Sequence, residues 1–533
     1  MITRRGLLHR IGAVGGLGAV YSAMLALGIE APAGAATAPI LPSSLGKGRK
    51  VIVLGAGIAG LVSAYELEQA GFEVTLLEAR GRVGGRAWTL RPGDKVEMIG
   101  EETQTVGFSD GLYMNAGPAR LPSFHQGMLG YARKFGVPME VEVNSSRSAY
   151  IMANDGSRIR LRAAVSDMRG YVSELLAKAL NQGALNQSVS PADKERLIPF
   201  LKAYGDLDGQ GRFTGTDRDG FATVPGAGLT FGEAVKPLPL GQILGNEQLP
   251  MTLFDEVIYM QATMFQPVGG MDRIHAGFDR NLKAPAIRNA EVTKIGQSHK
   301  GVRVSYRDKT SGATRTLNAD YLICTIPFPV LTKIPADFSA PVKNAISGVQ
   351  YDHSNKVGFD APRFWEADQI YGGLSFVGGE TGLVWYPSAG IFGSRGMLLA
   401  CYGSGPPAAQ FEKRPLAEQI ALARGVIERL HPGHGKDLSA PVAVNWRKIP
   451  YSLGPWPAWD PANAGKQEAR IDTPGYRLLQ QPDGRVYFAT AALSQTPGWQ
   501  EGGVQSAWAQ VAAIAARVSA EAVVSPNKIV SAA

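Results

Sequence analysis

The sequence contains little cysteine and little histidine. Its 533 residues include two cysteines, Cys324 and Cys401, and seven histidines that are not closely spaced. Two thiols are too few for a disulfide framework or a cysteine-rich metal centre, and scattered histidines do not form a zinc site. The sequence therefore predicts no bound metal, and redox chemistry in this chain would need an organic cofactor.

A concentrated basic segment is also missing. The formal net charge is +8, yet lysine and arginine are spread along the chain, apart from Arg4, Arg5 and Arg10. Proteins that bind nucleic acid gather such residues on one surface, so we expect no nucleic-acid partner. Apolar residues make up 45%, and no repeat or low-complexity tract interrupts the chain. This composition predicts a globular protein with more than one packed unit.

Long apolar runs are confined to the N-terminus. The run from Ile11 to Gly28 follows an arginine pair and precedes the small residues 31–36, but five glycines dilute it. A membrane anchor is the alternative, although 18 weakly hydrophobic residues are close to the lower limit for spanning a bilayer. The segment 1–36 resembles a twin-arginine signal peptide. That resemblance implies cleavage, export to the periplasm or the medium, and no stable membrane insertion afterwards.

A dinucleotide-binding strand–helix–strand unit is predicted at 50–78. A glycine-rich turn, Gly55-Ala56-Gly57-Ile58-Ala59-Gly60, joins an apolar strand to a helix, and the next strand ends at Glu78. Gly55 permits the tight turn, Gly57 lets the backbone approach a pyrophosphate, and Gly60 lets helix and strand pack. The carboxylate of Glu78 can accept both hydroxyls of an adenosine ribose. The complete unit separates this turn from one that serves packing alone.

The residues that follow distinguish FAD from a nicotinamide cofactor. Gly84-Gly85-Arg86 resembles the second phosphate-contacting turn of the flavin amine oxidase family, in which an arginine neutralises the pyrophosphate. Further segments similar to that family recur at 265–272, 319–327 and 486–504. One departure is Thr490-Ala491, where the family has Gly-Glu. The resemblance implies that FAD is bound without a covalent link by Gly55, Gly57, Ala59, Gly60, Glu78, Ala79, Arg80, Gly85, Arg86, Pro118, Ala119, Arg120, Val292, Trp446 and the backbone N–H groups of Gly503 and Val504.

The same resemblance implies the fold and its division. We expect an α/β and α+β architecture in which a discontinuous Rossmann-type FAD-binding domain adjoins a mixed-sheet substrate domain and a helical subdomain. The implied limits are a signal peptide at 1–36, an FAD-binding domain at 48–87, 265–348 and 480–522, a substrate-binding domain at 88–159 and 349–479, and a helical subdomain at 160–264.

The substrate side resembles the L-amino-acid oxidase branch of that family. The segment 112–122 contains Arg120, which corresponds to an arginine that binds the substrate carboxylate, and a guanidinium fork fixes a carboxylate in position and plane. The alternative for Arg120 is a surface ion pair. Tyr402 corresponds to a tyrosine that holds the same carboxylate. Lys356 corresponds to a lysine that holds a water beside the flavin, on a strand expected to alternate between buried and exposed positions.

Further residues complete the predicted site. Trp456 corresponds to a side-chain pocket residue, and Trp499 to an active-site aromatic residue, although core packing alone would also explain both. Gly498 offers a backbone carbonyl to the substrate amine. We therefore expect Arg120, Tyr402 and Lys356 to be the catalytic residues.

The resemblance implies an FAD-dependent L-amino-acid oxidase. Its substrates would be L-amino acids, with large apolar or aromatic ones preferred, and dioxygen; its products would be a 2-oxo acid, ammonia and hydrogen peroxide. A homodimer is left open. The alternatives are a decarboxylating, amide-forming amino-acid 2-monooxygenase and an amine or polyamine oxidase of the same fold, in which Arg120 would have no carboxylate to bind. A non-catalytic flavoprotein is kept open by Ala491.

Overall fold

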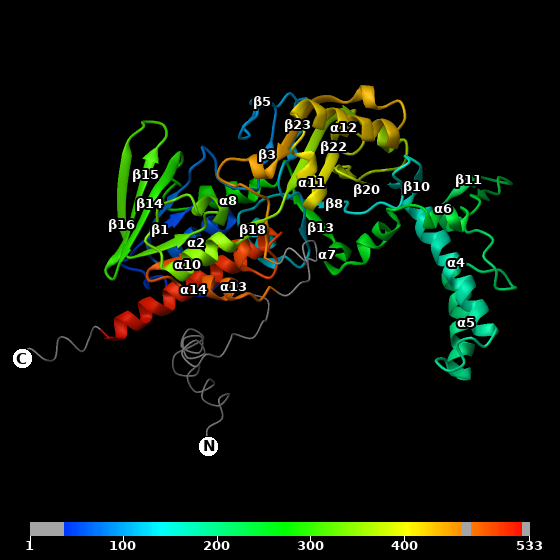
Figure 1. Ribbon diagram of the computed structural model, residues 1–533, viewed down its shortest axis with the longest axis horizontal. Coiled ribbons are helices and arrows are strands. Elements are labelled where there is room, and N and C mark those ends of the chain that lie inside the picture. The colour runs from blue at the N-terminus through cyan, green and yellow to red at the C-terminus, as the bar shows by residue number, and fades with distance from the viewer. Residues whose placement is uncertain (1–36, 460–470, 525–533) are drawn as a thin grey trace, which may run out of the picture.

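The computed structural model describes residues 37–459 and 471–524. The predicted signal peptide, 1–36, lies outside the described residues. Among the helices of the described ranges, none combines the length and the apolar character needed to cross a bilayer. The molecule is elongated, with a small sheet at one end of its long axis and a pair of helices projecting at the other (Figure 1).

A parallel sheet forms the centre of one half of the molecule. Its order is β2-β1-β17-β25, from strands at β1 (Lys50–Leu54), β2 (Glu73–Leu77), β17 (Tyr321–Cys324) and β25 (Val486–Phe488). The strands are apolar runs with little alternation, as expected for a parallel sheet covered on both faces. Three segments that are distant in sequence therefore build one sheet, which confirms the predicted discontinuous Rossmann-type fold.

Different elements cover the two faces of this sheet. Val51 and Val53 face a core shared with α2 (Ile58–Gln69) and α14 (Gln500–Val524). Ile52 and Leu54 point the other way, because successive strand side chains alternate, into a core shared with the antiparallel sheet β14-β15-β16. Elements around this second core are β14 (Ala290–Ser298), β15 (Gly301–Asp308), β16 (Thr314–Ala319), α9 (Phe328–Leu331), α10 (Ala340–Gly348) and α13 (Pro474–Leu479).

A larger mixed sheet forms the other half. Its order is β10-β9-β20-β21-β22-β19-β23, from strands at β9 (Tyr150–Met152), β10 (Arg158–Arg160), β19 (Ser354–Pro362), β20 (Leu374–Gly378), β21 (Gly382–Trp385), β22 (Arg395–Ser404) and β23 (Ser439–Asn445). The helices packed on it are α11 (Gly405–Phe411) and α12 (Leu416–Leu430). The predicted alternation of 354–359 is wrong, because β19 lies inside the sheet and is buried from Ser354 to Ala361.

Short strands and two helices connect the halves. A three-stranded sheet, β7-β13-β8, pairs β13 with both β7 and β8 and places Glu142 opposite Met264. The connecting elements are β3 (Thr89–Leu90), β4 (Lys95–Val96), β5 (Gln104–Thr105), β6 (Met114–Asn115), β7 (Leu121–Pro122), α3 (Gln126–Lys134), β8 (Met139–Glu142), β13 (Met264–Pro267), α8 (Asp272–Asn281), β18 (Gln350–Tyr351) and β24 (Pro457–Ala458).

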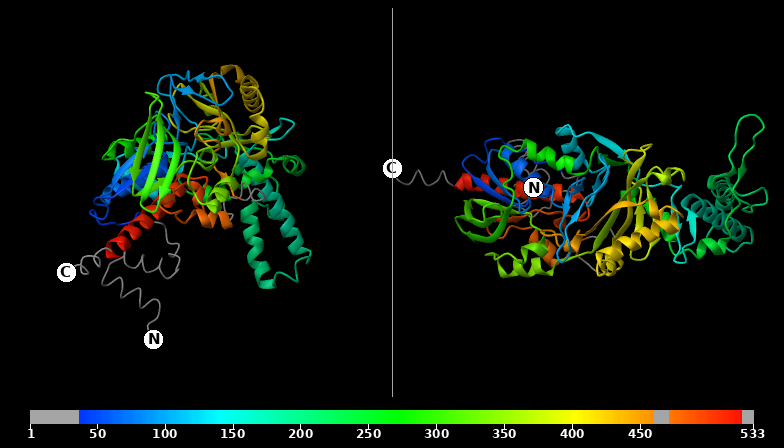
Figure 2. Two further views of the ribbon diagram at one scale, coloured as in Figure 1. Left: turned by 60° about the vertical axis from the view of Figure 1, so that its left-hand side comes forward. Right: turned by 90° about the horizontal axis from the view of Figure 1, so that it is seen from above.

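The helical region contains the two helices expected from spacing at 171–180 and 194–203. They are α4 (Leu161–Asn181) and α5 (Pro191–Gly205), and the hydroxyl of Ser190 caps α5 by accepting from the N–H of Asp193. Figure 1 and the left view of Figure 2 show this pair projecting away from the body. The remaining elements are β11 (Phe221–Thr223), β12 (Glu233–Ala234), α6 (Leu240–Leu244) and α7 (Ile258–Gln261). We propose the domain limits given above for these parts.

Candidate active site

A cavity of about 870 Å³ is lined from both large sheets. Sixteen predicted site residues line it, namely Gly55, Gly57, Ala59, Glu78, Ala79, Arg80, Gly85, Arg86, Pro118, Val292, Lys356, Tyr402, Trp446, Trp456, Gly498 and Trp499. Five others are not among its lining residues, namely Gly60, Ala119, Arg120, Gly503 and Val504. None of the lining residues comes from the described helical region, 160–264.

The first glycine turn leaves space where α2 begins. Gly55 has φ +94°, a value that side chains other than glycine rarely adopt. A Cβ on Gly57 would meet no atom within 4 Å, and Gly57 lines the cavity. A Cβ on Gly60 would lie 1.8 Å from the carbonyl oxygen of Gly55, so only glycine permits this contact. The turn therefore brings a helix N-terminus and open backbone to the cavity, the arrangement that binds phosphate.

The second glycine turn lies directly against the first. Gly85 has φ +57°, and a Cβ there would lie 3.2 Å from the Cα of Gly57. Arg86 lines the cavity beside these turns and donates from Nη1 to the carbonyl oxygen of Pro455 at 2.5 Å. Two glycine turns with an arginine at their side form a cradle of the size and charge that a pyrophosphate needs. The residues present thus fit the dinucleotide part of FAD.

Glu78 lies at the end of β2, where the adenosine ribose is expected. It is buried, and its two carboxylate oxygens accept hydrogen bonds from the N–H groups of Ala56 at 2.8 Å and Arg80 at 2.9 Å. The guanidinium of Arg80 lies 3.7 Å from the same carboxylate. These bonds fix the orientation of Glu78. Val292, near the start of β14, lines the same cavity.

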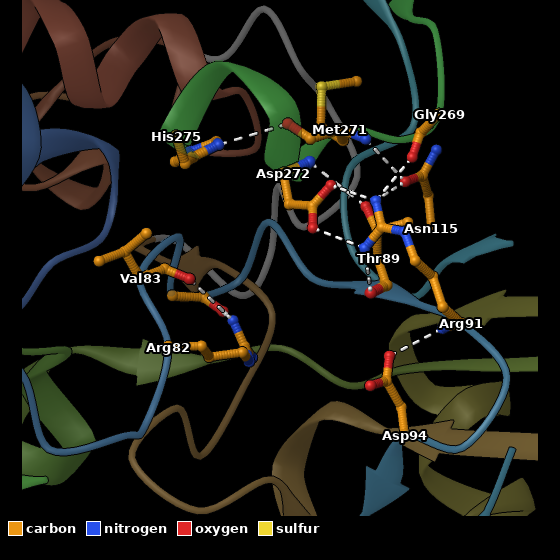
Figure 3. Close-up of polar contacts among 11 residues, drawn as sticks. Arg82, Val83, Thr89, Arg91, Asp94, Asn115, Gly269, Met271, Asp272 and His275 are labelled. Carbon is orange, nitrogen blue, oxygen red and sulfur yellow. Dashed lines mark hydrogen bonds and ion pairs between the residues drawn. The ribbon is translucent and has the colours of Figure 1, made fainter. Parts of the chain in front are cut away.

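Asn115 links Lys356 to the chain segments that contain Thr89 and Met271. Its Oδ1 accepts hydrogen bonds from Oγ1 of Thr89 at 2.8 Å and from the N–H of Met271 at 3.0 Å (Figure 3). Its backbone carbonyl accepts from Nζ of Lys356 at 3.0 Å. The neighbouring ion pair between Arg91 and Asp272, 2.8 Å long, holds the start of α8 in the same network (Figure 3). The sequence motif contains Asn115, but this role depends on contacts with segments far along the chain.

Lys356 is a buried cation with two fixed acceptors. Besides Asn115, the carbonyl of Gly117 accepts from its Nζ at 2.6 Å. Nζ also lies 5.5 Å from the ring centroid of Trp385 and 4.9 Å from that of Tyr402. Burial, and secondarily the charge of Arg120, lowers the pKa of Lys356 to about 7. The side chain can therefore change its charge near neutral pH while its position stays fixed.

Arg120 contacts the same Trp385 ring as Lys356. Its guanidinium carbon is 4.7 Å from the ring centroid of Trp385, and its Nη1 donates to Oδ1 of Asn144 at 2.5 Å. Burial lowers the pKa of Arg120, while Glu142 and Tyr402 oppose that effect. Within the described ranges, Arg120 has no carboxylate within 4.0 Å. It is therefore a partly buried cation that lacks a close anion.

Aromatic side chains enclose the end of the cavity that contains Lys356. Tyr402 stacks on Trp385 with ring centroids 6.1 Å apart, and burial raises its pKa whereas Arg120 lowers it. Trp446 and Trp456 are oriented by indole N–H bonds to Ala116 and Asp352 at 3.0 and 3.2 Å. Trp499 stacks on Tyr259 of α7 at 5.7 Å, so the helical region supports this wall. The wall suits an apolar or aromatic side chain.

Three residues in this cluster were not found from the sequence. They are Trp385, Asn144 and Glu142. The ring of Trp385 contacts both Arg120 and Lys356, and Asn144 accepts a hydrogen bond from Arg120. Glu142 accepts a hydrogen bond from the indole N–H of Trp385 at 3.1 Å. No local motif marks them. The departure at Ala491 does fall in the cavity lining, so the missing carboxylate would have faced the cavity.

Together these groups can bind a small carboxylate near an oxidising cofactor. Arg120 and Tyr402 offer a cation and a hydroxyl, and Lys356, the glycine turns and three tryptophans line the same cavity. Such an arrangement positions a substrate beside the cofactor, which supplies the redox chemistry.

Comparison with known proteins points to flavin-dependent oxidation. The family model described as flavin containing amine oxidoreductase matches residues 58–515. The flavin-dependent L-tryptophan oxidase RebO of Lentzea aerocolonigenes is 27% identical over 496 residues, covering 88% of this chain and 98% of RebO. An L-amino-acid oxidase of Siganus canaliculatus is 26% identical over 480 residues, covering 86% of this chain and 83% of that protein.

A solved structure supports the fold. A triple mutant of putrescine oxidase superposes with a TM-score of 0.58 at 18% identity, covering 88% of this chain and 99% of that chain. At this identity the likeness concerns the architecture only.

Proposed function

The chain belongs to the family of flavin-containing amine oxidoreductases, and we propose that within this family it oxidises L-amino acids. It is an FAD-dependent oxidoreductase, and its curated relatives include L-amino-acid oxidases. The proposed reaction converts an L-amino acid, water and dioxygen to a 2-oxo acid, ammonia and hydrogen peroxide. We also propose export through the twin-arginine segment 1–36.

The observation that carries this proposal is the state of Arg120. A guanidinium held against Trp385 and Asn144, with no carboxylate within 4.0 Å in the described residues, is suited to receive a carboxylate from a ligand. An amine substrate without a carboxylate would leave this cation without an anion. The hydroxyl of Tyr402, whose electrostatic coupling to Arg120 shows in both pKa shifts, would hold the second carboxylate oxygen.

FAD, when bound, supplies the acceptor for the hydride that leaves Cα and then passes both electrons to dioxygen. The residues of this chain prepare that transfer. Arg120 and Tyr402 fix the carboxylate, and the carbonyl of Gly498 accepts from the neutral amine. Once the wall of Trp456 and Trp499 also places the side chain, three groups on Cα are fixed, and only one enantiomer presents its hydrogen to the cofactor. No side-chain base is needed once the amine is neutral.

Lys356 has a different role in this proposal. Its Nζ is held by the carbonyls of Asn115 and Gly117 at the cavity wall and retains capacity for one further hydrogen bond. We assign to it a water that attacks the imino acid product, and a positive charge that favours dioxygen reduction. Trp456 and Trp499 would form the wall for the substrate side chain, which favours large apolar and aromatic amino acids.

The test is anaerobic reduction of the bound flavin by the twenty L-amino acids, followed in air by assays of peroxide, 2-oxo acid and amide. We expect bleaching by apolar L-amino acids, with stoichiometric 2-oxo acid and peroxide. Amide with carbon dioxide would instead show a monooxygenase, and bleaching by polyamines alone would show an amine oxidase.

The carboxylate assignment is tested with a matched pair of arginines. Arg120→Ala should lower kcat/KM by about a hundredfold or more, because a charge-assisted contact of roughly 3 kcal/mol is lost. Arg147→Ala is the control, because Arg147 is partly exposed and pairs with Asp255 at 3.4 Å. Both variants should retain FAD. Near-normal kcat/KM in Arg120→Ala would refute the assignment.

A further inference from the structure

A carboxylate that the proposed reaction does not use lies next to the Arg120 cluster. Glu142, the last residue of β8, is 2% exposed. Its Oε1 accepts a hydrogen bond from Nε1 of Trp385 at 3.1 Å. Its Oε2 is buried and has no hydrogen-bond partner in the described part of the chain. A carboxylate oxygen in this situation is costly unless a cation or a proton compensates it.

The compensating cation is Arg120. The ring of Trp385 contacts the guanidinium of Arg120 on its face and Glu142 at its N–H, so one indole separates the two charges. Burial raises the pKa of Glu142 to about 6, and the charge of Arg120, the largest opposing effect, keeps it from rising further. In the described part of the chain, Glu142 is thus a carboxylate whose charge acts on Arg120.

We propose that binding of the substrate carboxylate to Arg120 makes Glu142 take up a proton from the solvent. This inference rests on the proposed function of Arg120. Once its guanidinium pairs with a ligand carboxylate, two carboxylates share one cation, and the buried one loses its compensation. Because its burial is unchanged, the pKa of Glu142 must rise. The proton comes from bulk water and forms one O–H bond, so Glu142 becomes a neutral acid and acts on the substrate only through Arg120.

Other titratable groups near Glu142 must be separated from it. Across Trp385 lie Lys356 and Tyr402, and the strand paired with β8 places the non-titratable Met264 opposite Glu142. Burial raises the pKa of Tyr402, so it does not titrate near neutrality. Lys356, with its pKa lowered to about 7, would also hold a proton more tightly beside a bound anion. Its contribution has the same sign but is centred at higher pH.

The size of the effect follows from linkage. At pH 7 a carboxyl group with a pKa of about 6 is about nine-tenths ionised, so binding should take up about 0.4 of a proton if the pKa rises to about 7 and about 0.9 of a proton if Glu142 becomes fully protonated. The protonated form of Glu142 favours the ligand. Affinity is therefore highest below pH 6 and falls by up to about tenfold per pH unit as the pH rises above 6.

The experiment uses the oxidised holoenzyme and benzoate, a carboxylate without an amine. Titration calorimetry at pH 6.5 in two buffers of different ionisation enthalpy gives the protons taken up, and Kd is measured from pH 5.5 to 8. The central variant is Glu142→Gln. The control is Glu140→Gln, since Glu140 lies two residues earlier on β8 and accepts instead from Gln266 at 2.9 Å.

We expect benzoate binding to take up protons in the wild type and in Glu140→Gln. In Glu142→Gln most of this proton uptake should be lost, and the benzoate Kd should not change between pH 5.5 and 6.5. Trp385→Phe provides a second measurement that does not alter Glu142. Without the indole N–H, the pKa of Glu142 rises, so the fall in affinity should begin at higher pH.

Two outcomes overturn the inference while leaving the proposed function intact. Unchanged uptake in Glu142→Gln rejects it, and loss of uptake only in Lys356→Met assigns the proton to the lysine. A benzoate Kd that is the same in wild type and Arg120→Ala would instead reject the carboxylate assignment itself. The absorbance spectrum of bound FAD shows whether each variant is folded and loaded.

Discussion

Replacing Lys356 by methionine should slow the reaction of the reduced enzyme with dioxygen and remove its pH dependence. Burial, and secondarily Arg120, lowers the pKa of Lys356 from 10.5 to about 7, which corresponds to a penalty on the ammonium form of on the order of 5 kcal/mol. The proton is therefore lost as the pH rises through 7. Below that pH the ammonium stabilises the negative charge that develops on dioxygen.

The expected size follows from the strength of a charged contact. A buried cation in contact with a developing anion contributes about 1.5–3 kcal/mol, or roughly tenfold to a hundredfold in rate. In wild type, the reoxidation rate constant should fall with a midpoint near pH 7. In Lys356→Met it should be low and constant from pH 5.5 to 8.5. Arg120→Gln removes the neighbouring charge and should raise the midpoint by about one pH unit or more.

The assay is stopped-flow mixing of enzyme reduced by light with oxygenated buffer, which does not depend on substrate binding. Lys448→Met is the matched control, because Lys448 pairs with Glu101 at 2.6 Å and is not part of the cavity lining. Wild-type reoxidation in Lys356→Met, or an effect confined to KM for the amino acid, would refute the assignment.

Four further outcomes are expected. Acid precipitation should release all the yellow cofactor, because both cysteines are buried and neither belongs to the cavity lining; flavin in the pellet would contradict this. Kcat/KM should be higher for L-phenylalanine than for L-lysine, and Trp456→Ala should narrow the difference, whereas preference for lysine would reject the apolar wall. Gly57→Val should yield folded protein without FAD, because the valine side chain would fill the open space at the first glycine turn. Gly130→Val is the control and should bind FAD normally, because its Cβ also meets open space but Gly130 does not line the cavity. Burial and the adjacent Asp167 raise the pKa of Asp219 to about 8, so the folded state loses stability as the pH rises from about 4 to 8. Asp219→Asn should therefore raise Tm at pH 8 and change Tm little at pH 4.

The parts of the fold that local sequence determines were predictable. A positive φ favours glycine at Gly55 and the close approach to the Gly55 carbonyl requires it at Gly60, both within six residues of chain, and the two flanking strands are apolar runs. The helices α4 and α5 were visible from their spacing. The sequence predicts that buried and exposed residues alternate along β19. A strand inside a sheet that is covered on both faces is buried at nearly every position, so its residues show no such alternation.

The charge environment of the site was not predictable, because it depends on distant segments. The acceptors of Lys356 come from residues 239 and 241 positions earlier. Glu142 lies in the sequence Met-Glu-Val-Glu, which resembles a solvated edge strand, yet it is buried and its hydrogen-bond donor, Trp385, lies 243 positions away. Arg120 was recognised through the motif, yet its contacts with Asn144 and Trp385 come from segments that no local pattern connects to it.

The order of the parallel sheet also sets the order in which this protein can fold during synthesis. β1 has β17 as a neighbour, and 270 residues separate Val51 from its register partner Tyr321, while β25 follows later still. At about 5–20 residues per second, the ribosome needs on the order of tens of seconds to deliver β17 after β1. During that interval the glycine turn cannot close against Thr325, so the nascent chain exposes an incomplete sheet edge. FAD can therefore be captured only near the end of translation, and chaperone demand should be greatest just before that point.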